Sequence, residues 1–254
     1  MMNEVIERLR QGHRTMAFPS DAVRMPDRFL GRPEIAPEKL TDAERRRAVE
    51  VCPTAAVTEA DGALQLDLGR CVFCGACADA CPGGGIVFTP DYRMTVRTRA
   101  DLQLAGATLK LAAALDVKAR RLFGHSLKLR EVSAGGCNAC EADTNVLGTP
   151  AWDLGRFGIQ FVASPRHADG VLVTGPVTEN MRTALLQTWD AIPAPKLVIA
   201  VGSCAIAGGP YVGHPECHDG ADRLLPVDLY IPGCPPHPAT ILDGLLRLLG
   251  RMEK

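Results

Sequence analysis

The heptapeptide GGCNACE, residues 135–141, decides how the C-terminal part of the chain is organised. It follows an extended run, residues 126–133, and precedes a stretch of helical pattern. Cys204 and Cys234 lie far downstream, each just past an apolar segment of strand character. Ligands of open α/β sheets bind beyond the carboxyl ends of the strands, so we expect three strand ends to present four thiols to one point. Four converging thiolates are the ligands that an iron–sulfur cluster requires.

Strands and helices alternate in the predicted structure of residues 126–254. The expected strands are Leu127–Val132, Ile159–Ala163, Gly170–Thr174, Leu197–Val201 and Leu229–Ile231, and the expected helices are Ala139–Leu147, Glu179–Asp190 and Pro238–Arg251. Continuous apolar strands that alternate with helices indicate a parallel sheet covered on both faces. The predicted fold class of this part is therefore an α/β, flavodoxin-like parallel-sheet domain.

The glycines around Cys204, in the segment GSCAIAGG, raise the question of a phosphate-binding loop. The segment lacks the Gly-Lys-Ser/Thr ending of such loops. We interpret its glycines instead as positions where the backbone approaches a cluster closely.

A second cysteine group, CVFCGACADACP, has the spacing C-x2-C-x2-C-x3-C-P over residues 71–82. Zinc is the competing interpretation of any C-x2-C pair, but the third close cysteine and the proline disfavour it. Residues 41–92 also contain two similar halves, each with a helix that ends in Cys-Pro and is followed by a turn and a strand. This module resembles the bacterial-type two-cluster ferredoxins, which have an α+β ferredoxin-like fold.

The first half departs from the ferredoxin pattern. In that family each half supplies three cysteines to its own cluster and a fourth, before proline, to the other cluster. The three positions that precede Cys52 with the matching spacing are occupied by Asp42, Arg45 and Ala48. One cluster site has lost those ligands, and the resemblance implies that the remaining cluster is held by Cys52, Cys71, Cys74 and Cys77. The alternative is that Cys81 is a ligand and Cys52 is not.

The composition is close to a soluble globular average apart from its ten cysteines. Hydrophobic residues make up 46% and charged residues 22%, and the net charge of −1 gives no bulk attraction to nucleic acid or to an anionic membrane. The first residues contain no apolar core of a secretory signal, so clustered cysteines favour metal binding over disulfides. The most apolar window, residues 102–117, is too short to span a bilayer, and membrane association is expected only through partners.

Four segments are predicted along the chain. Residues 1–40 form an extended N-terminal arm with a short helix at residues 4–11, or a disordered tail over the first fifteen residues. The other segments are a ferredoxin-type [4Fe–4S] domain over 41–95, a helical connector over 96–125 and the α/β domain over 126–254. The connector prediction rests on leucines at helical spacing.

The motifs ASPRHAD, VGSCA and PGCPP carry a more specific resemblance. With the stretch that begins at GGCNACE, they resemble the family that holds the small subunits of [NiFe] hydrogenases and the 20-kDa (B) subunit of respiratory complex I. The resemblance covers roughly residues 120–250. It implies that the [4Fe–4S] cluster nearest to the active site of a large partner subunit is held by Cys137, Cys140, Cys204 and Cys234. Together with the ferredoxin-type site, two [4Fe–4S] clusters are expected.

One detail separates the branches of this family. Complex I proteins have adjacent cysteines at the first position, whereas here Asn138 and Ala139 separate them, as in the hydrogenase branch. The chain therefore resembles the small subunits of energy-converting, formate hydrogenlyase-type [NiFe] hydrogenases, with a ferredoxin module fused to it.

The implied function is electron relay between a ferredoxin-type cluster and the cluster proximal to the large-subunit active site. The implied partners are a hydrogenase large subunit, or the equivalent 49-kDa-like subunit of complex I, and other subunits of a membrane-bound complex. The chain itself is expected on the cytoplasmic face, with no membrane span, no nucleic-acid partner and no catalytic acid or base. The alternatives are a complex I-like NADH or ferredoxin:quinone oxidoreductase subunit without nickel, and a stand-alone electron carrier.

Two further features remain open at this point. Cys217 lies between His214 and His218, but the family does not use a cysteine there as a ligand, so no metal is predicted. Glu141 follows Cys140 and either tunes the cluster, carries protons or stabilises the first turn of a helix.

Overall fold

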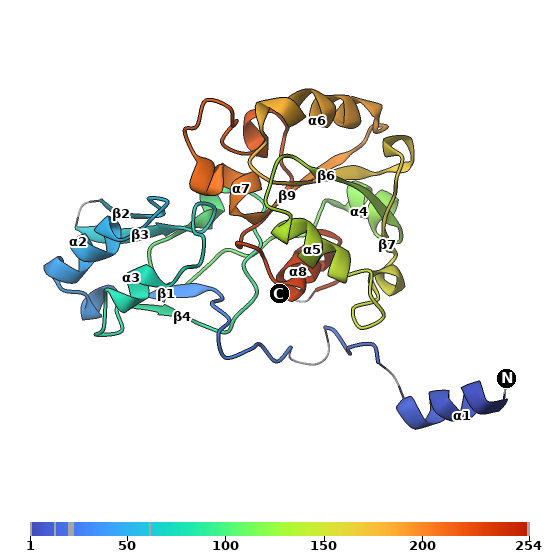
Figure 1. Ribbon diagram of the computed structural model, residues 1–254, viewed down its shortest axis with the longest axis horizontal. Helices are drawn as coiled ribbons and strands as arrows, with labels where there is room; N and C mark the ends of the chain where they lie inside the picture. Colours follow the sequence, from blue (N-terminus) through green and yellow to red (C-terminus); the bar gives the residue numbers. More distant parts are fainter. Residues whose placement is uncertain (1, 13, 20–22, 61, 253–254) are drawn as a thin grey trace.

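The computed structural model describes residues 2–12, 14–19, 23–60 and 62–252. Two modules lie side by side, and helix α1 (Met2–Gln11) extends away from both at the end of the N-terminal arm (Figure 1). The helix predicted near residues 4–11 is therefore present. Within the described ranges, none of the helices combines the length and the hydropathy needed to cross a membrane.

The N-terminal module consists of two β–α–β halves. Their elements are β1 (Pro33–Ile35), α2 (Asp42–Glu50) and β2 (Val57–Ala60), then β3 (Ala63–Asp67), α3 (Ala76–Asp79) and β4 (Ile86–Phe88). β1 of the first half pairs antiparallel with β4 of the second half, and β2 pairs antiparallel with β3. Each of the two small sheets therefore contains strands from both halves. Helix α2 begins with a capping box, because the Glu44 N–H donates to Thr41 Oγ1 and the Thr41 N–H donates to Glu44 Oε2.

Two predictions about the segments that flank this module are wrong. Residues 33–35, placed in the arm, form β1, and a strand this short has no periodicity that a sequence can reveal. The connector is helical only in α4 (Val117–Phe123); before it the chain forms η2 (Arg99–Leu102) and β5 (Gln103–Leu104). β5 pairs with β3 and buries Leu104, so sheet pairing overrides the helical spacing of the leucines.

Five parallel strands form the sheet of the C-terminal module. They are β6 (Leu127–Ser133), β7 (Ile159–Phe161), β8 (Gly170–Thr174), β9 (Leu197–Val201) and β10 (Leu229–Ile231). Their spatial order is β7-β6-β8-β9-β10, which corresponds to 2-1-3-4-5 along the chain. β8, β9 and β10 are buried at every residue, as their continuous apolar runs predict. The five predicted strands are confirmed, with β7 ending two residues early.

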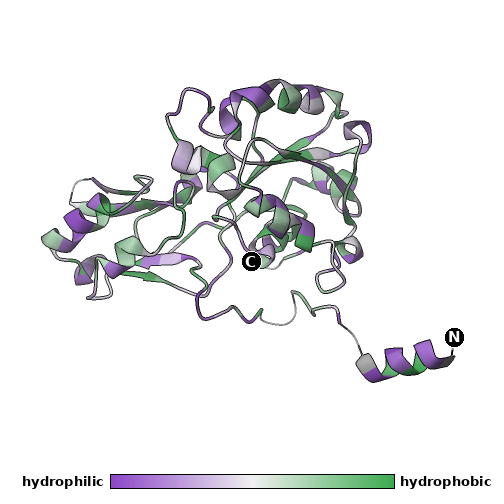
Figure 2. Cartoon of the chain, in the orientation of Figure 1, coloured by the Kyte–Doolittle hydropathy of each residue, from purple (hydrophilic) through white to green (hydrophobic). Residues whose placement is uncertain are grey.

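Helices cover both faces of this sheet. They are α5 (Ala139–Val146), α6 (Glu179–Ala191), α7 (Gly202–Ala207) and α8 (Pro238–Leu248). Ile199 and Val201 of β9 pack in one core with α8, whereas Val198 and Ala200 pack in a second core with α6 and α7. Figure 2 shows the apolar strands in green and the helices with both polar (purple) and apolar (green) residues. Short 3-10 turns complete the chain: η1 (Pro37–Lys39), η3 (Leu154–Phe157), η4 (Pro165–His167), η5 (Gly209–Tyr211) and η6 (Ala221–Arg223).

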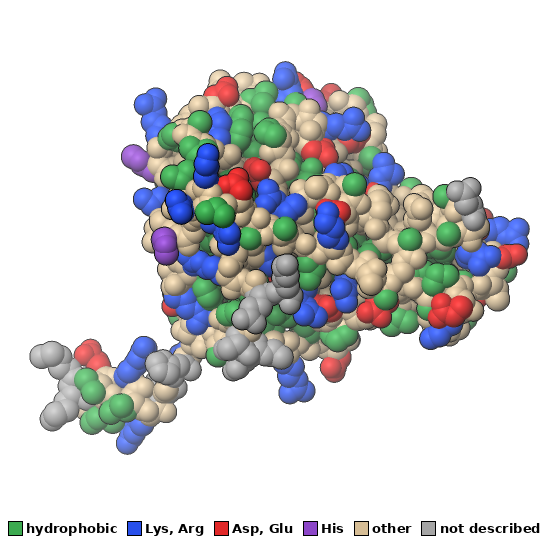
Figure 3. All heavy atoms as spheres, turned by 180° about the vertical axis from the view of Figure 1, so that it is seen from behind, with side chains coloured by type: hydrophobic (Ala, Val, Ile, Leu, Met, Phe, Trp, Pro, Cys, Tyr) green, Lys and Arg blue, Asp and Glu red, His purple; other side chains and the backbone are tan. Residues whose placement is uncertain are grey.

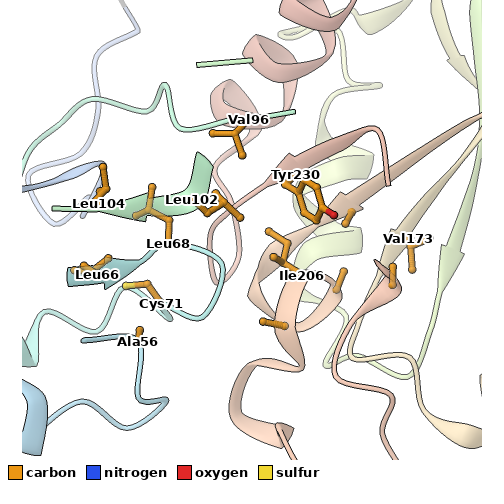
Figure 4. Packing of buried hydrophobic residues seen from close by; sticks show 14 of the residues in the cluster. Ala56, Leu66, Leu68, Cys71, Val96, Leu102, Leu104, Val173, Ile206 and Tyr230 are labelled. Atoms are coloured by element: carbon orange, nitrogen blue, oxygen red, sulfur yellow. The ribbon is translucent and has the colours of Figure 1, made fainter. Parts of the chain in front are cut away.

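The second core continues into the N-terminal module. Leu68 and Leu102 of that module belong to the same buried cluster as Ile206 of α7 and Tyr230 of β10 (Figure 4). Backbone hydrogen bonds also cross the boundary, since Val96 and Tyr230 each donate an N–H to the carbonyl of the other. A shared core holds the two cysteine groups in a fixed relation to each other.

Charged side chains are dispersed over the face shown in Figure 3, where acidic and basic groups are intermixed. This distribution agrees with the net charge of −1. Apolar side chains are exposed on α1, where Val5 is 58% and Leu9 is 78% exposed.

Candidate functional site

The first cysteine group lies beyond the carboxyl ends of β6, β9 and β10. These strands belong to one parallel sheet, so their carboxyl ends share an edge. Cys137 lies in the loop after β6, Cys140 in the first turn of α5, Cys204 in the first turn of α7 and Cys234 in the loop after β10. The structure therefore brings together the four thiols that the sequence predicts at this edge.

Electrostatic coupling shows how close these thiols are. Burial raises the pKa of the Cys140 thiol, and negative charge at Cys204, Glu141, Cys234 and Cys137 raises it further. Burial also raises the pKa of Cys204 to about 12, and charges at Cys234 and Cys137 add to that shift. Negative charge on the neighbouring thiols thus opposes the ionisation of Cys140 and of Cys204.

Such a donor set fits a [4Fe–4S] cluster. Four thiolates in a half-buried site need positive charge among them, and the iron of a cluster would supply it while deprotonating its ligands. When bound, a cluster of this kind accepts and releases single electrons.

Two glycines let the thiols approach the backbone. A Cβ on Gly202, which has a φ of +87°, would lie 2.5 Å from Cys140 Sγ. A Cβ on Gly209, with a φ of +56°, would lie 2.7 Å from Cys204 Sγ. The sequence interpretation of these glycines as close-approach positions therefore matches the geometry, and neither needs a phosphate.

Replacing Gly202 with alanine is expected to destabilise the folded chain by about 2–4 kcal/mol, from left-handed strain and from the clash with Cys140. The matched control is Gly213→Ala, because Gly213 has a φ of +76° but a Cβ added there would meet no atom within 4 Å. The control variant should lose only the free energy of the left-handed backbone strain, about 1–2 kcal/mol. Denaturant unfolding of both variants checks this, and equal losses would contradict a steric role for Gly202.

Glu141 is a buried carboxylate beside this site, with 6% of its surface exposed. Its Oε1 accepts hydrogen bonds from Ser133 Oγ at 2.5 Å and Thr174 Oγ1 at 2.7 Å. Burial opposes ionisation, but these two hydroxyls outweigh it and leave the pKa of Glu141 below its usual value. The carboxylate is thus held as an anion next to Cys140.

Glu131 on β6 has a raised pKa, in contrast to Glu141. Its Oε1 is buried without a hydrogen-bond partner, and burial together with the nearby charge of Glu141 raises its pKa to about 7. The folded chain therefore binds this proton more tightly than the unfolded chain does, and stability is lost as the pH rises from the ordinary carboxyl pKa of 4.5 towards 7.

Glu131→Gln removes this titration. The stability of the variant relative to that of the wild type should therefore increase by about 1–3 kcal/mol as the pH rises from about 5 to about 8. Glu38→Gln, at an exposed position, serves as the control and should show no such gain. Thermal unfolding at the two pH values measures the difference, and a gain that is independent of pH would refute the assignment.

The second cysteine group surrounds a small cavity in the N-terminal module. The cavity is lined by Cys52, Cys71, Cys74 and Cys77. Phe73 and Gly75 have positive φ angles of 53° and 82°, which wrap the loop tightly. The Ala56 N–H donates to Cys52 Sγ at 3.2 Å, and the Phe73 N–H donates to Cys71 Sγ at 3.3 Å. Three cysteines of the loop and one from the other half, with N–H groups that donate to their sulfurs, are the kind of ligand set that holds an iron–sulfur cluster.

Cys81 points away from that cavity. Its Sγ lies 3.8 Å from the carbonyl oxygen of Glu44, and its pKa is raised by burial and by the charge of Glu44. By contrast, burial and the charges of the other cavity cysteines raise the pKa of Cys71 to about 12. The geometry thus groups Cys52 with the loop and leaves Cys81 alone.

The three positions that lost their cysteines now serve packing and ion pairing. Ala48 is fully buried in the core of the module. Arg45 pairs with Asp42 and with Glu59, and it donates to the carbonyl of Leu40 at 3.0 Å. Leu40, which comes just before helix α2, is also buried and packs against Gly85.

The two histidines around Cys217 form local hydrogen bonds. His218 Nε2 lies 2.6 Å from Glu179 Oε2, and His214 Nδ1 accepts the Glu216 N–H. In the described part of the chain, no three His, Cys, Asp or Glu side chains are grouped to hold a single metal ion.

Comparison with known proteins agrees with both groups of cysteines. Residues 137–248 match the family described as NADH ubiquinone oxidoreductase, 20 Kd subunit, and residues 64–87 match a 4Fe-4S binding domain. The probable membrane-bound hydrogenase subunit mbhJ of Pyrococcus furiosus is 40% identical over 134 residues, which are 53% of this chain and 80% of that relative. The chain belongs to this 20-kDa subunit family. It is a subunit of an oxidoreductase.

Two further proteins are similar to this chain, each over a little more than half of its length. Formate hydrogenlyase subunit 7 of Escherichia coli is 41% identical over 142 residues, which are 56% of each chain. A chain in the structure of a membrane-bound sulfane sulfur reductase, an archaeal respiratory membrane complex, is 34% identical and has a TM-score of 0.47, with 54% of this chain and 75% of that chain covered.

Sequence reasoning missed one buried polar residue between the two cysteine groups, Ser203. Its Oγ lies 2.5 Å from the Cys71 carbonyl oxygen, to which it donates, and 3.0 Å from the Gly233 carbonyl oxygen in the loop of the other group. Its position directly before Cys204 was the only available signal.

Proposed function

We propose that this chain is the electron-transfer subunit of a membrane-associated [NiFe]-hydrogenase-like complex. One [4Fe–4S] cluster is held by Cys52, Cys71, Cys74 and Cys77. The other, nearest to the active site on a large partner subunit, is held by Cys137, Cys140, Cys204 and Cys234. The chain acts on the peripheral, cytoplasmic side of the complex and joins the membrane through other subunits.

The observation that carries this proposal is the pair of four-cysteine sites in two modules that share one core. A relay needs two redox sites at a fixed separation, and the continuous packing from Leu68 to Ile206 and Tyr230 supplies that rigidity. The Cys137–Cys140 spacing and the names of the two curated relatives support the hydrogenase branch.

The residues of this chain bind and insulate the clusters rather than perform acid–base chemistry. Cys71 and Cys77 are each 7% exposed, so the protein excludes water from that side of the first cluster. Cys137, Cys234 and Cys74 are exposed, which leaves an open side for a partner at each site. Burial, N–H donors and the Glu141 charge are the means by which the chain sets cluster potentials.

We also assign the modules to known classes. The β1–α2–β2 and β3–α3–β4 halves support a ferredoxin-like domain, and the 2-1-3-4-5 strand order supports a flavodoxin-like domain over residues 126–254. The ferredoxin-like domain begins at β1 rather than at residue 41.

The second candidate function is a complex I-like subunit whose large partner lacks nickel and serves quinone reduction. The family description of residues 137–248 favours it. The separated pair Cys137 and Cys140 favours the hydrogenase interpretation instead.

An affinity tag on this chain and anaerobic purification of the native complex distinguish the two. The proposal predicts a co-purifying large subunit and about one nickel per complex, since each large subunit of this type has one active site. A large subunit without nickel would favour the complex I-like function. A chain that purifies alone as a soluble monomer, with both clusters, would overturn both in favour of a free electron carrier.

A further inference from the structure

Ser203 lies between the two cysteine groups and is only 1% exposed. Its Oγ donates to the carbonyl oxygen of Cys71 at 2.5 Å and reaches the carbonyl oxygen of Gly233 at 3.0 Å. Its own N–H donates to the same Gly233 carbonyl at 2.9 Å. Ser203 directly precedes Cys204, and Gly233 directly precedes Cys234. A single buried hydroxyl thus joins the backbone of Cys71, in the N-terminal module, to the backbone next to Cys204 and Cys234, in the C-terminal module.

The backbone on both sides of this contact is held firmly. The Cys71 N–H donates to the Asp67 carbonyl at 3.0 Å, and the Gly69 N–H donates to Asp67 Oδ1 at 2.8 Å. Asp67 in turn forms a bidentate pair with Arg99. A Cβ on Gly69 would lie 2.7 Å from Ile206 Cγ2, so the loop before Cys71 touches α7 directly. A close contact between the modules therefore lies beside the hydrogen bond of Ser203.

We infer that Ser203 is the bridge through which the two clusters are electronically coupled. The inference rests on the proposed function, because it requires a cluster at each site. With a cluster at each site, one electron would pass from one to the other, and this chain would form or break no bond because the Ser203 proton stays on Oγ. The path runs from Cys71 through its carbonyl and the Ser203 hydroxyl to Cys204. Ser203 is a positioning residue, because it acts through these cysteines and touches neither cluster.

A second approach between the modules is less direct. Phe73 of the N-terminal cysteine loop and Cys234 of the C-terminal site line one cavity, together with residues 28–30 and His237. A route through this cavity would leave the covalent chain, whereas the Ser203 path is covalent except for one short hydrogen bond. Neither Ser203 nor Cys71 lines this cavity, so variants can separate the two routes.

The test uses the intact complex with wild type, Ser203→Ala, Ser203→Thr and two comparison variants. Ser203→Thr keeps the hydroxyl. Thr240→Val removes another fully buried hydroxyl, one without a hydrogen-bond partner, on α8. Phe29→Leu changes the lining of the cavity route without touching either cysteine loop. For each complex, iron content and the potential of each cluster are measured first. The rate of electron equilibration between the clusters is then followed after rapid photoreduction, and their magnetic coupling is followed by electron paramagnetic resonance.

The expected result is a severalfold slower equilibration and weaker magnetic coupling in Ser203→Ala, with iron content and both potentials unchanged. Ser203→Thr should restore the rate, and Thr240→Val and Phe29→Leu should match the wild type. An unchanged rate in Ser203→Ala would overturn the inference, as would a slow rate in Phe29→Leu alone. Loss of iron in Ser203→Ala would also overturn it, because the hydroxyl would then be a folding element. A wild-type complex with fewer than two clusters would instead contradict the proposed function.

Discussion

Replacing Cys52 with alanine should lower the iron content from about eight to about four atoms per chain, because one [4Fe–4S] cluster loses a ligand. The reason is geometric: Cys52 lines the same cavity as Cys71, Cys74 and Cys77, although it lies outside their local motif. Iron analysis and electron paramagnetic resonance of the reduced, anaerobically purified chain provide the measurement. The signal that disappears should be the one that depends on Cys71.

Cys81→Ala is the matched control for this prediction. Cys81 is buried like Cys71 and Cys77, at 2% exposed, but it faces the Glu44 carbonyl on α2. Its replacement should leave the iron content at the wild-type value and cost about 1 kcal/mol of stability for the lost sulfur contacts. The opposite pattern, with iron lost in Cys81→Ala and kept in Cys52→Ala, would show that the local motif supplies all four ligands.

The second large effect is expected for Cys204→Ala. Its thiol is coupled to Cys234 and Cys137 and occupies the first turn of α7, so its loss should remove the second cluster and again about four iron atoms per chain. Electron flow to the large subunit should then stop, while the spectrum of the ferredoxin-type cluster is retained.

Cys217→Ala tests whether any cysteine near this site has the same effect. The charge of Cys217 also raises the pKa of Cys204, which places it in the same neighbourhood. Cys217 is not one of the four proposed ligands, so the iron content and the turnover of the complex should be unchanged in this variant. A loss of iron in this variant would mean that the site draws on a fifth cysteine.

The C-terminal sheet was predictable because its signal is local. Strands such as Gly170–Thr174 are continuous apolar runs, and burial on both faces demands that pattern. The same reasoning located the loops after β6, β9 and β10, and therefore the four cysteines near their ends. In these places local pattern and tertiary packing agree.

The errors arose where tertiary contacts decide the structure. β1 and β5 are two or three residues long and exist only because β4 and β3 pair with them. Leu102 and Leu104 look helical in spacing, but they are buried in the small sheet. α7 was missed because Gly202–Ala207 is short and rich in small residues. The bridge at Ser203 joins residues 132 positions apart, which no local pattern reveals.

The most direct test of the two-cluster account is the iron content of the anaerobically purified chain, with Mössbauer spectroscopy to identify the cluster type. The account predicts about eight iron atoms per chain, all in [4Fe–4S] clusters. About four would mean that one of the two cysteine groups is empty. About twelve would mean that the half-site around Asp42, Arg45 and Ala48 holds a third cluster, which would contradict the assignment of Cys52 and Cys81.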